Sequence, residues 1–262
     1  MLRALYSSAS GMESQQMNLD VIANNLANVN TTGFKKAKIE FQDLLYQTKR
    51  AAGSESGPGT QVPTSLQVGH GARPVSTAKI FTAGEIMSTG ERLDLAIHGN
   101  GFFKVTLADG TNAFTRDGGF KLDSTGQIVT SDGLPVTSFA GVTIGPEATN
   151  VSISQTGVVS VTQNGTTSTA GSLVLSRFAN PAGLENIGAN LYRETPASGT
   201  EQTGEPANAG MGTVQQGYLE LSNVKVVEEM VNLIKAQRAY EINSKAIQAA
   251  DEMMSMSNRL RG

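Results

Sequence analysis

Apolar residues recur at alternating spacings of three and four at both ends of the chain. Near the N-terminus the row is broken only by Gln16, and its members are Leu2, Leu5, Ala9, Met12, Leu19, Ala23 and Leu26. Near the C-terminus the first row consists of Ala239, Ile242, Ala246, Ala249, Met253, Met256 and Leu260. This spacing is typical of a helix that buries one face against a partner helix, as in a coiled coil. It predicts a helix from residue 2 to about 29 and another that ends near 258.

The last helix carries a second apolar row beside the first. Its members are Leu233, Ala236, Tyr240, Ile247, Ala250 and Met254. Together the two rows make an apolar face that is too wide for one partner helix to cover. The helix is expected to begin after Ser222 or Asn223, because either side chain could cap its first turn. A chain with such faces at both ends is expected to associate.

The residues between the helices have the pattern of strands and turns. Apolar and polar residues alternate at Leu93 to Ile97, Phe103 to Leu107, and Val151 to Val161, whereas Ile39 to Tyr46 could form a strand or a short helix. A turn is marked by Asp109-Gly110, and two more by the dipeptides Asp132-Gly133 and Asn164-Gly165, which type I′ hairpins favour. The predicted fold class is α+β, with the terminal helices paired as a coiled-coil-like domain and a central antiparallel β-rich domain.

Two polar stretches rich in Gly, Pro and Thr interrupt this pattern, at 51–65 and at 194–212. The first is expected to be extended, with too little apolar surface to fold alone, and the second to be a linker. Val62, Leu66 and Val68 are predicted to anchor the first stretch on an adjacent subunit. The predicted organisation is therefore an N-terminal helical segment at 1–46, an extended stretch at 47–69, a β-rich domain at 70–193, a linker and return segment at 194–221, and a C-terminal helix at 222–262.

Composition excludes several classes of function. The formal net charge of -3 and the absence of Trp argue against nucleic acid as a partner. The absence of Cys excludes disulfides and a thiol nucleophile. Lys35, Lys36 and Lys38 form the one basic cluster, which we interpret as a solvated helix edge. His70 and His98 lack the spacing of a metal site. No apolar run is long enough for a membrane span or a secretory signal.

Aspartates occur throughout the β-region without forming an acid–base pair. They lie in or before turns, as Asp94, Asp109, Asp117, Asp123 and Asp132. We therefore expect neither an enzyme nor a bound cofactor.

Two segments carry a specific resemblance. Residues 23–35 (Ala-Asn-Asn-Leu-Ala-Asn-Val-Asn-Thr-Thr-Gly-Phe-Lys) closely resemble the N-terminal signature of bacterial flagellar rod and hook proteins. Residues 237–246 (Gln-Arg-Ala-Tyr-Glu-Ile-Asn-Ser-Lys-Ala) are similar to the C-terminal signature of that family. Flanking segments at 44–48, 66–71, 114–118 and 216–220 look like the branch that builds the distal rod of the basal body.

The resemblance implies a structural subunit of a straight, rigid helical tube that transmits torque and encloses the export channel. It also implies partners: further copies, proximal rod and hook proteins, ring-shaped bushings and the flagellar type III export apparatus. The rod would span the periplasm to the outer membrane, and its subunits would be exported without a cleaved signal peptide. Two alternatives remain open: another axial protein (proximal rod or hook, the insert at 51–65 arguing against a hook), or an extracytoplasmic wall hydrolase.

These considerations nominate two sets of functional residues. Subunit contacts are predicted for Leu2, Leu5, Ala9, Met12, Leu19, Ala23, Asn24, Asn25, Leu26, Asn28, Gly33, Phe34, Leu233, Tyr240, Ile242, Asn243, Ala246, Ile247 and Met253. A polar stripe on the last helix, predicted to face the channel, consists of Asn232, Lys235, Glu241, Lys245, Gln248 and Glu252. Gly33 is expected to allow the turn that ends the first helix, with Phe34 packing back on it.

Overall fold

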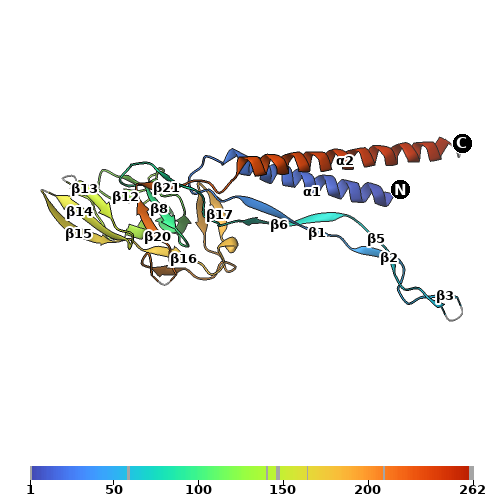
Figure 1. The fold of residues 1–262 in the computed structure, drawn as a ribbon, viewed down its shortest axis with the longest axis horizontal. Helices are drawn as coiled ribbons and strands as arrows, with labels where there is room; N and C mark the ends of the chain where they lie inside the picture. The colour runs from blue at the N-terminus through green and yellow to red at the C-terminus, as the bar shows by residue number, and fades with distance from the viewer. Residues whose placement is uncertain are drawn as a thin grey trace. The chain divides into compact units, whose positions relative to one another are not determined.

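The computed structural model describes residues 2–57, 60–139, 141–145, 148–163, 165–208 and 210–259. It shows an α+β protein with an N-terminal helix, a β-rich middle and a C-terminal helix, as predicted (Figure 1). The chain forms two compact units, each built from separate stretches of sequence. Unit 1 is Met1–Ala27, Ala37–Ala78 and Lys225–Gly262, and unit 2 is Asn28–Lys36 and Lys79–Val224. The predicted domains follow one another in sequence, whereas these units interleave.

Unit 1 contains both helices, α1 (Leu2–Ala27) and α2 (Val226–Arg259), which lie side by side (Figure 1). A Cβ atom added at Gly11 would lie 2.8 Å from Nδ2 of Asn243, and Nδ2 of Asn25 lies 3.4 Å from Oε2 of Glu229. The two contacts lie about two heptads apart along each helix. The contact nearer the start of α1 is the one nearer the end of α2, so the helices are antiparallel over about 20 Å. Within the described part of the chain, neither helix is long and apolar enough to cross a bilayer.

Unit 1 also contains a hairpin arm, made of three successive pairs of strands. The pairs are β1 (Ala37–Asp43) with β6 (Ala72–Lys79), β2 (Tyr46–Arg50) with β5 (Leu66–Gly69), and β3 (Glu55–Gly57) with β4 (Thr60–Gln61). The ambiguous segment that begins at Ile39 is therefore a strand. The stretch at 51–65 differs from the prediction, because it folds back on itself instead of running on as one extended segment. Pro58 lies outside the described residues.

Unit 2 is the β-rich middle, and its strand pairs are antiparallel as predicted. One sheet has the order β17 (Glu185–Gly188), β18 (Leu191–Arg193), β10 (Asn112–Thr115), β9 (Phe103–Thr106). A second has the order β13 (Ala148–Ile153), β14 (Val158–Gln163), β15 (Thr166–Ser172). Two-stranded pieces are β11 (Lys121–Leu122) with β12 (Ile128–Val129), β16 (Leu175–Arg177) with β19 (Gln202–Gly204), β20 (Thr213–Gln216) with β8 (Leu95–His98), and β21 (Tyr218–Glu220) with β7 (Ile86–Ser88). Short 3-10 turns occur at Thr137–Phe139 and Pro181–Gly183.

The core of unit 2 is built from the alternating residues that the sequence identified. Leu95, Ile97 and Phe103 are at most 1% exposed, and Val151 pairs with Val161 across β13 and β14. A separate cluster joins Phe102, Phe114, Phe178 and Tyr192, whose rings meet edge to face. The unit therefore has a core of its own.

Two of the predicted turns are formed, and the one at Asp132-Gly133 differs from the predicted type. In the Asp109-Gly110 turn, the backbone N–H of Gly110 donates to the oxygen of Leu107, and that of Leu107 donates to Thr111. Gly110 has a φ of 82°, whereas Asp109 is not among the non-glycine residues with positive φ. The turn at Asp132-Gly133 has the same pattern. Each is therefore a longer loop that needs only one left-handed residue, at the glycine, and the type I′ prediction for Asp132-Gly133 is wrong. Asn164 lies outside the described residues.

The stretch at 194–212 is also integrated more closely than a linker would be. Its strand β19 pairs with β16, and Glu201 accepts hydrogen bonds from Nζ of Lys104 at 2.8 Å and from the hydroxyl of Ser176 at 2.6 Å. Polar side chains thus attach this segment to unit 2 without the apolar pattern from which strands are normally predicted.

Candidate assembly interface

The two apolar rows of α2 differ in exposure. In the second row, Ala236 and Ala250 are 2% exposed, and the other members are half-buried or, at Tyr240, 39% exposed. In the first row, Ile242 is 66% exposed and Met256 is 54% exposed. Thus the second row lies on the side of α2 that is packed within unit 1, and the first row is left largely uncovered by the described residues. Leu260 lies outside them.

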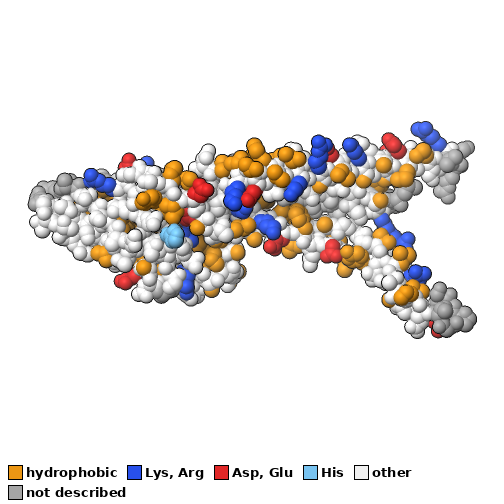
Figure 2. Space-filling view, in the orientation of Figure 1, with side chains coloured by type: hydrophobic (Ala, Val, Ile, Leu, Met, Phe, Trp, Pro, Cys, Tyr) orange, Lys and Arg blue, Asp and Glu red, His pale blue; other side chains and the backbone are white. Residues whose placement is uncertain are grey.

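The first half of α2 carries further exposed apolar side chains. Figure 2 shows apolar side chains gathered over this part of the helix, where Val226, Val227, Met230, Val231 and Ile234 are all exposed. Val227 is the most exposed of the five, at 75%. Single exposed apolar residues are common on soluble proteins, but a continuous apolar patch of this kind marks a surface that binds another chain.

The apolar row of α1 lies beside its contact with α2. Leu5, Met12, Leu19 and Leu26 are half-buried, Ala9 and Ala23 are exposed, and the side chain of Leu2 lies outside the described residues. The contact with α2 uses Gly11 and Asn25 instead, and the hydroxyl of Ser14 donates to the oxygen of Ala72 in the arm at 3.4 Å. On α1 the packing within the chain is therefore made by small and polar residues together with Ile22, which is 4% exposed, and the apolar row lies beside it.

The polar residues predicted to face a channel are all exposed in the structure. At about 100° per residue, Glu241, Lys245, Gln248 and Glu252 fall within one narrow sector of α2. The same geometry places Asn232 and Lys235 on another side of the helix. The polar stripe therefore consists of Glu241, Lys245, Gln248 and Glu252.

Asn25 closes the loop that follows α1. Its Nδ2 donates to the oxygen of Ala37 at 2.8 Å, and its Oδ1 accepts from the nitrogen of Ala37 at 2.9 Å. The side chain thus pairs with Ala37 as a neighbouring strand would, and it is 2% exposed. Asn28 accepts from the hydroxyl of Thr31 at 3.2 Å, while Asn24 is exposed. The buried amide of Asn25 therefore stabilises the fold of its own chain, and the other two asparagines remain candidates for subunit contacts.

Gly33 has a different role from the expected helix terminator. Helix α1 ends at Ala27, well before Gly33, which has a φ of 67°. A Cβ atom at Gly33 would lie 2.7 Å from the carbonyl carbon of Arg116, so a side chain does not fit there. Phe34 is buried, and Nζ of Lys79 lies 4.3 Å from the centre of its ring. The signature glycine therefore allows two backbone segments of unit 2 to approach closely.

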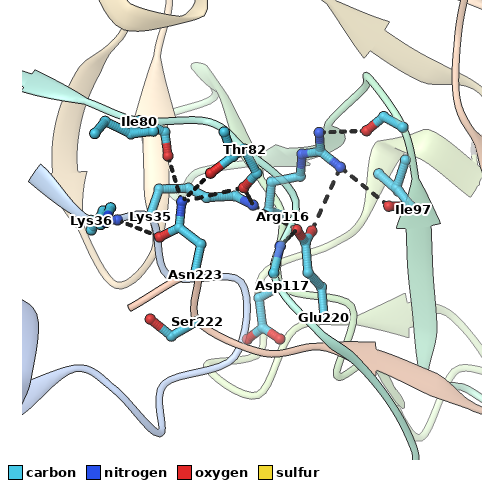
Figure 3. Close-up of polar contacts among 12 residues, drawn as sticks. Lys35, Lys36, Ile80, Thr82, Ile97, Arg116, Asp117, Glu220, Ser222 and Asn223 are labelled. Atoms are coloured by element: carbon cyan, nitrogen blue, oxygen red, sulfur yellow. Dashed lines mark hydrogen bonds and ion pairs between the residues drawn. The ribbon is translucent and has the colours of Figure 1, made fainter. Parts of the chain in front are cut away.

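The next residue of the signature, Lys35, belongs to a buried charge cluster that the sequence reasoning missed. Nζ of Lys35 lies 2.5 Å from Oε1 of Glu220 and donates to the oxygen of Thr82 at 2.8 Å (Figure 3). Nη1 of Arg116 lies 3.6 Å from Oε2 of Glu220. The three charged side chains are 0 to 3% exposed. The interpretation of Lys35 as part of a solvated edge is therefore wrong.

Asn223 connects the same segments with neutral hydrogen bonds. Its Oδ1 accepts from the nitrogen of Lys36 at 2.8 Å, and its Nδ2 donates to the oxygen of Ile80 at 2.7 Å (Figure 3). The hydroxyl of Ser222 accepts from the nitrogen of Val224. Because α2 begins only at Val226, neither residue caps it as predicted: Asn223 joins segments of unit 2, and Ser222 makes a local turn.

Burial dominates the electrostatics of this cluster. It lowers the pKa of Lys35, and the adjacent carboxylate of Glu220 counteracts that shift. It also lowers the pKa of Arg116 and raises the pKa of Tyr192 to about 12. Two buried cations thus share one carboxylate, so the carboxylate is essential to the stability of both.

Replacing that carboxylate should destabilise unit 2 strongly. For Glu220→Gln we expect the free energy of unfolding to fall by about 3–5 kcal/mol, because two buried cations lose their counter-charge. Urea denaturation of the full chain, followed by circular dichroism, measures this loss. The matched control is Glu185→Gln. It removes the ion pair between Glu185 and Arg193, whose side chains are about half exposed. It should change the free energy by less than about 1 kcal/mol, and an equally small loss for Glu220→Gln would contradict the role of the cluster.

Within the described residues, no group of three or more His, Asp or Glu side chains is arranged to hold a metal ion. The features that stand out are uncovered helix faces and a buried cluster that joins the segments of unit 2. They define the class of structural proteins that act by assembling with other chains.

Comparisons with known proteins identify the family. The model described as "Flagella basal body rod protein" matches residues 5–35, "Flagellar hook protein FlgE/F/G D1 domain" matches 96–161, and "Flagellar basal body rod FlgEFG protein C-terminal" matches 215–260. The flagellar basal-body rod protein FlgG of Borreliella burgdorferi is 50% identical over 100% of this chain and 99% of its own length.

Two proteins of one organism indicate the branch of the family. The flagellar basal-body rod protein FlgG of Caulobacter vibrioides is 47% identical over 99% of this chain and 100% of its own length. The rod protein FlgF of the same organism is 36% identical over 95% and 94%. The chain belongs to the family of flagellar basal-body rod proteins, and its function is that of a structural subunit of the rod.

Proposed function

We propose that the chain polymerises into the straight tube of the distal rod, with α1 and α2 paired as a coiled-coil-like inner domain and the β-rich unit outside it. The greater similarity to FlgG than to FlgF supports the distal position. As a rod subunit the chain would transmit torque, and its polymer would enclose the export channel. It acts by assembly and has no catalytic role.

One observation carries this proposal: the apolar side chains of α2 that its own chain leaves uncovered. Ile242, Ile234 and Val227 are 56 to 75% exposed. Burying apolar surface stabilises an interface by about 25 cal/mol for each Å² removed from water. A helical polymer brings several neighbours against each subunit, so it can cover a face that α1 leaves open.

The same proposal assigns the partners. Along its axis the rod would join the proximal rod and the hook, and around it the ring bushings would allow rotation. The chain would reach this position across the periplasm through the flagellar type III export apparatus. The predicted subunit contacts, including Asn24, Asn28 and Asn243, belong to this proposal, as does the domain organisation.

Electron microscopy of the polymer tests the proposal directly. Purified chain, concentrated until it assembles, should form straight tubes with a continuous central bore, and a reconstruction should place α1 and α2 around that bore. Filaments that lack a bore, or that place the β-rich unit along it, would contradict the proposed arrangement.

The polar stripe should control export without controlling assembly. Charges of both signs and an amide would keep the channel wall hydrated without strongly attracting an unfolded charged cargo. Converting Glu241, Lys245 and Gln248 together to Leu should slow export of later axial proteins while leaving the rod assembled. The measurement is the amount of hook protein secreted per rod. A matched triple substitution to Ser should export normally, and equal export by both variants would place the stripe elsewhere.

A further inference from the structure

Methionine supplies all the sulfur of this chain, which has nine methionines and no cysteine. Hydrogen peroxide and hypochlorous acid transfer an oxygen atom to a thioether and convert methionine to methionine sulfoxide. In many proteins an exposed thiol reacts with such oxidants first, but this chain has none. The methionines are therefore the residues at which these oxidants would modify the chain.

Exposure divides the methionines that the structure describes. Met211 is buried in the core of unit 2, at 8% exposed, and Met12 and Met254 are half-buried. The exposed ones are Met17 on α1, Met87 in β7, and Met230, Met253 and Met256 on α2, of which the last three are 49 to 54% exposed. An oxidant must reach the sulfur from solvent. In the free chain the three methionines of α2 should therefore react readily, whereas Met211 should be protected.

The exposed methionines of α2 lie in the apolar surface that the described residues leave uncovered. Met253 and Met256 belong to the first apolar row, and about 100° per residue places both on the same side of α2 as Ile242. Met230 belongs to the exposed apolar patch on the first half of the helix. A sulfoxide is polar, so burying it against apolar side chains is unfavourable. Oxidation would therefore change the chemistry of the surface through which the chain is proposed to assemble.

We propose that Met230, Met253 and Met256 are oxidation sites that control assembly: peroxide converts them to sulfoxides in the free chain, and the oxidised chain does not enter the polymer. The inference rests on the proposed function, because neighbouring copies must cover this surface of α2 for the modification to matter. Within the polymer the same contacts would shield the sulfur atoms. Oxidation therefore acts on subunits before they are incorporated.

The reaction needs only the oxidant and the thioether. A lone pair of the methionine sulfur attacks one oxygen of hydrogen peroxide, and the S–O bond forms as the O–O bond breaks. The proton on the transferred oxygen moves to the departing oxygen, which leaves as water. Sulfur is oxidised by two electrons and the peroxide is reduced by two, so the product is methionine sulfoxide and one molecule of water.

Peptide mapping by mass spectrometry tests the sites of modification. In full-length monomer treated with hydrogen peroxide, Met230, Met253 and Met256 should be oxidised at least about tenfold faster than the buried Met211. In polymer that is already assembled, the same three should react at least about tenfold more slowly than in the monomer, because close-packed interfaces exclude the oxidant. Equal rates at these three and at Met211 in the monomer would refute the oxidation sites.

Assembly of the oxidised chain tests the consequence. Peroxide treatment should raise the concentration needed for assembly at least about tenfold, with unchanged circular dichroism. Methionine sulfoxide reductases for both epimers should restore normal assembly. The triple variant Met230→Leu, Met253→Leu and Met256→Leu should assemble normally before and after peroxide, because Leu and Met have similar volumes and Leu does not form a sulfoxide. The matched control, Met87→Leu, removes an exposed methionine of unit 2 and should stay as sensitive as the unmodified chain.

The outcomes separate this inference from the proposed function. Normal assembly of the peroxide-treated chain would refute the inference, as would a triple variant that peroxide still inhibits. Failure of the reductases to restore assembly would refute it without relying on any substitution. In each of these cases, normal tubes of the untreated chain would leave the proposed function standing. Failure of the untreated chain to assemble would contradict the proposed function instead.

Discussion

Ile242→Asp should abolish assembly while leaving the β-rich unit folded. Ile242 is 66% exposed in the single chain, so the new carboxylate stays hydrated in the monomer and costs little stability. In the polymer the same carboxylate would be buried at every repeated contact, at a cost of several kcal/mol each. We therefore expect the concentration required for assembly to rise at least about a hundredfold, measured by sedimentation and electron microscopy.

The control for Ile242→Asp places the same charge on the same helix but outside the apolar row. Gln248 belongs to the polar stripe and is exposed, so Gln248→Asp should assemble at nearly the normal concentration. Circular dichroism and protease resistance should show a folded β-rich unit in both variants. If Ile242→Asp formed normal rods and supported motility, the first apolar row would not be a subunit contact.

The helices were predictable because their heptad spacing is a local property of the sequence. Which apolar row would pack within the chain was not predictable, because both rows of α2 have similar spacing and composition. The choice depends on α1, where Gly11 leaves room for Asn243 and the amide of Asn25 reaches Glu229. Ile22, at 4% exposed, packs on the same face of α1. It lies outside the apolar row, and the contacts of Gly11 and Asn25 leave no mark in a pattern of apolar residues.

The buried cluster was missed for a related reason. Lys35 stands beside two other lysines, and nothing local separates the buried side chain from its neighbours. Its carboxylate partner is 185 residues away along the chain. One signal was available, because Lys35, Arg116 and Glu220 each lie in a segment that resembles the family. Considering the charged residues of such segments together, as possible ion-pair partners, would point to this cluster.

The hairpin arm was misjudged because its strands pair by backbone hydrogen bonds with little apolar burial. Val62 shows the consequence. Predicted as an anchor for a neighbouring subunit, it is 8% exposed and packs near the tip of the arm. Leu45, at 88% exposed, and Tyr46, at 55%, are apolar side chains that the sequence reasoning had not selected as anchors. Leu66, at 52% exposed, remains one of the predicted anchors.

Shortening the arm should yield rods that assemble but bend. Tyr46 pairs with Gly69, so residues 47–68 can be replaced by Asn-Gly to leave a short hairpin closed by a two-residue turn. The lost part extends about 40 Å from Tyr46, at about 3.3 Å per residue, which is far enough to reach an adjacent subunit. Docked between subunits, it would fill the gaps that must close when a tube bends, and close-packed interfaces resist compression.

The experiment measures curvature and persistence length of the shortened rods by electron microscopy, against rods of the unmodified chain. A second variant tests whether the arm stiffens the rod by packing or only by connecting subunits. In it, residues 51–63 are replaced by a Gly/Ser stretch of equal length, which keeps the span but removes Val62 and the pairing of β3 with β4. If the arm stiffens the rod by packing, both variants should bend, and Leu45→Ser should bend less than either because one anchor is lost. Rods of the shortened variant as straight as the unmodified ones would show that the arm is a passive loop and that stiffness resides in the helices.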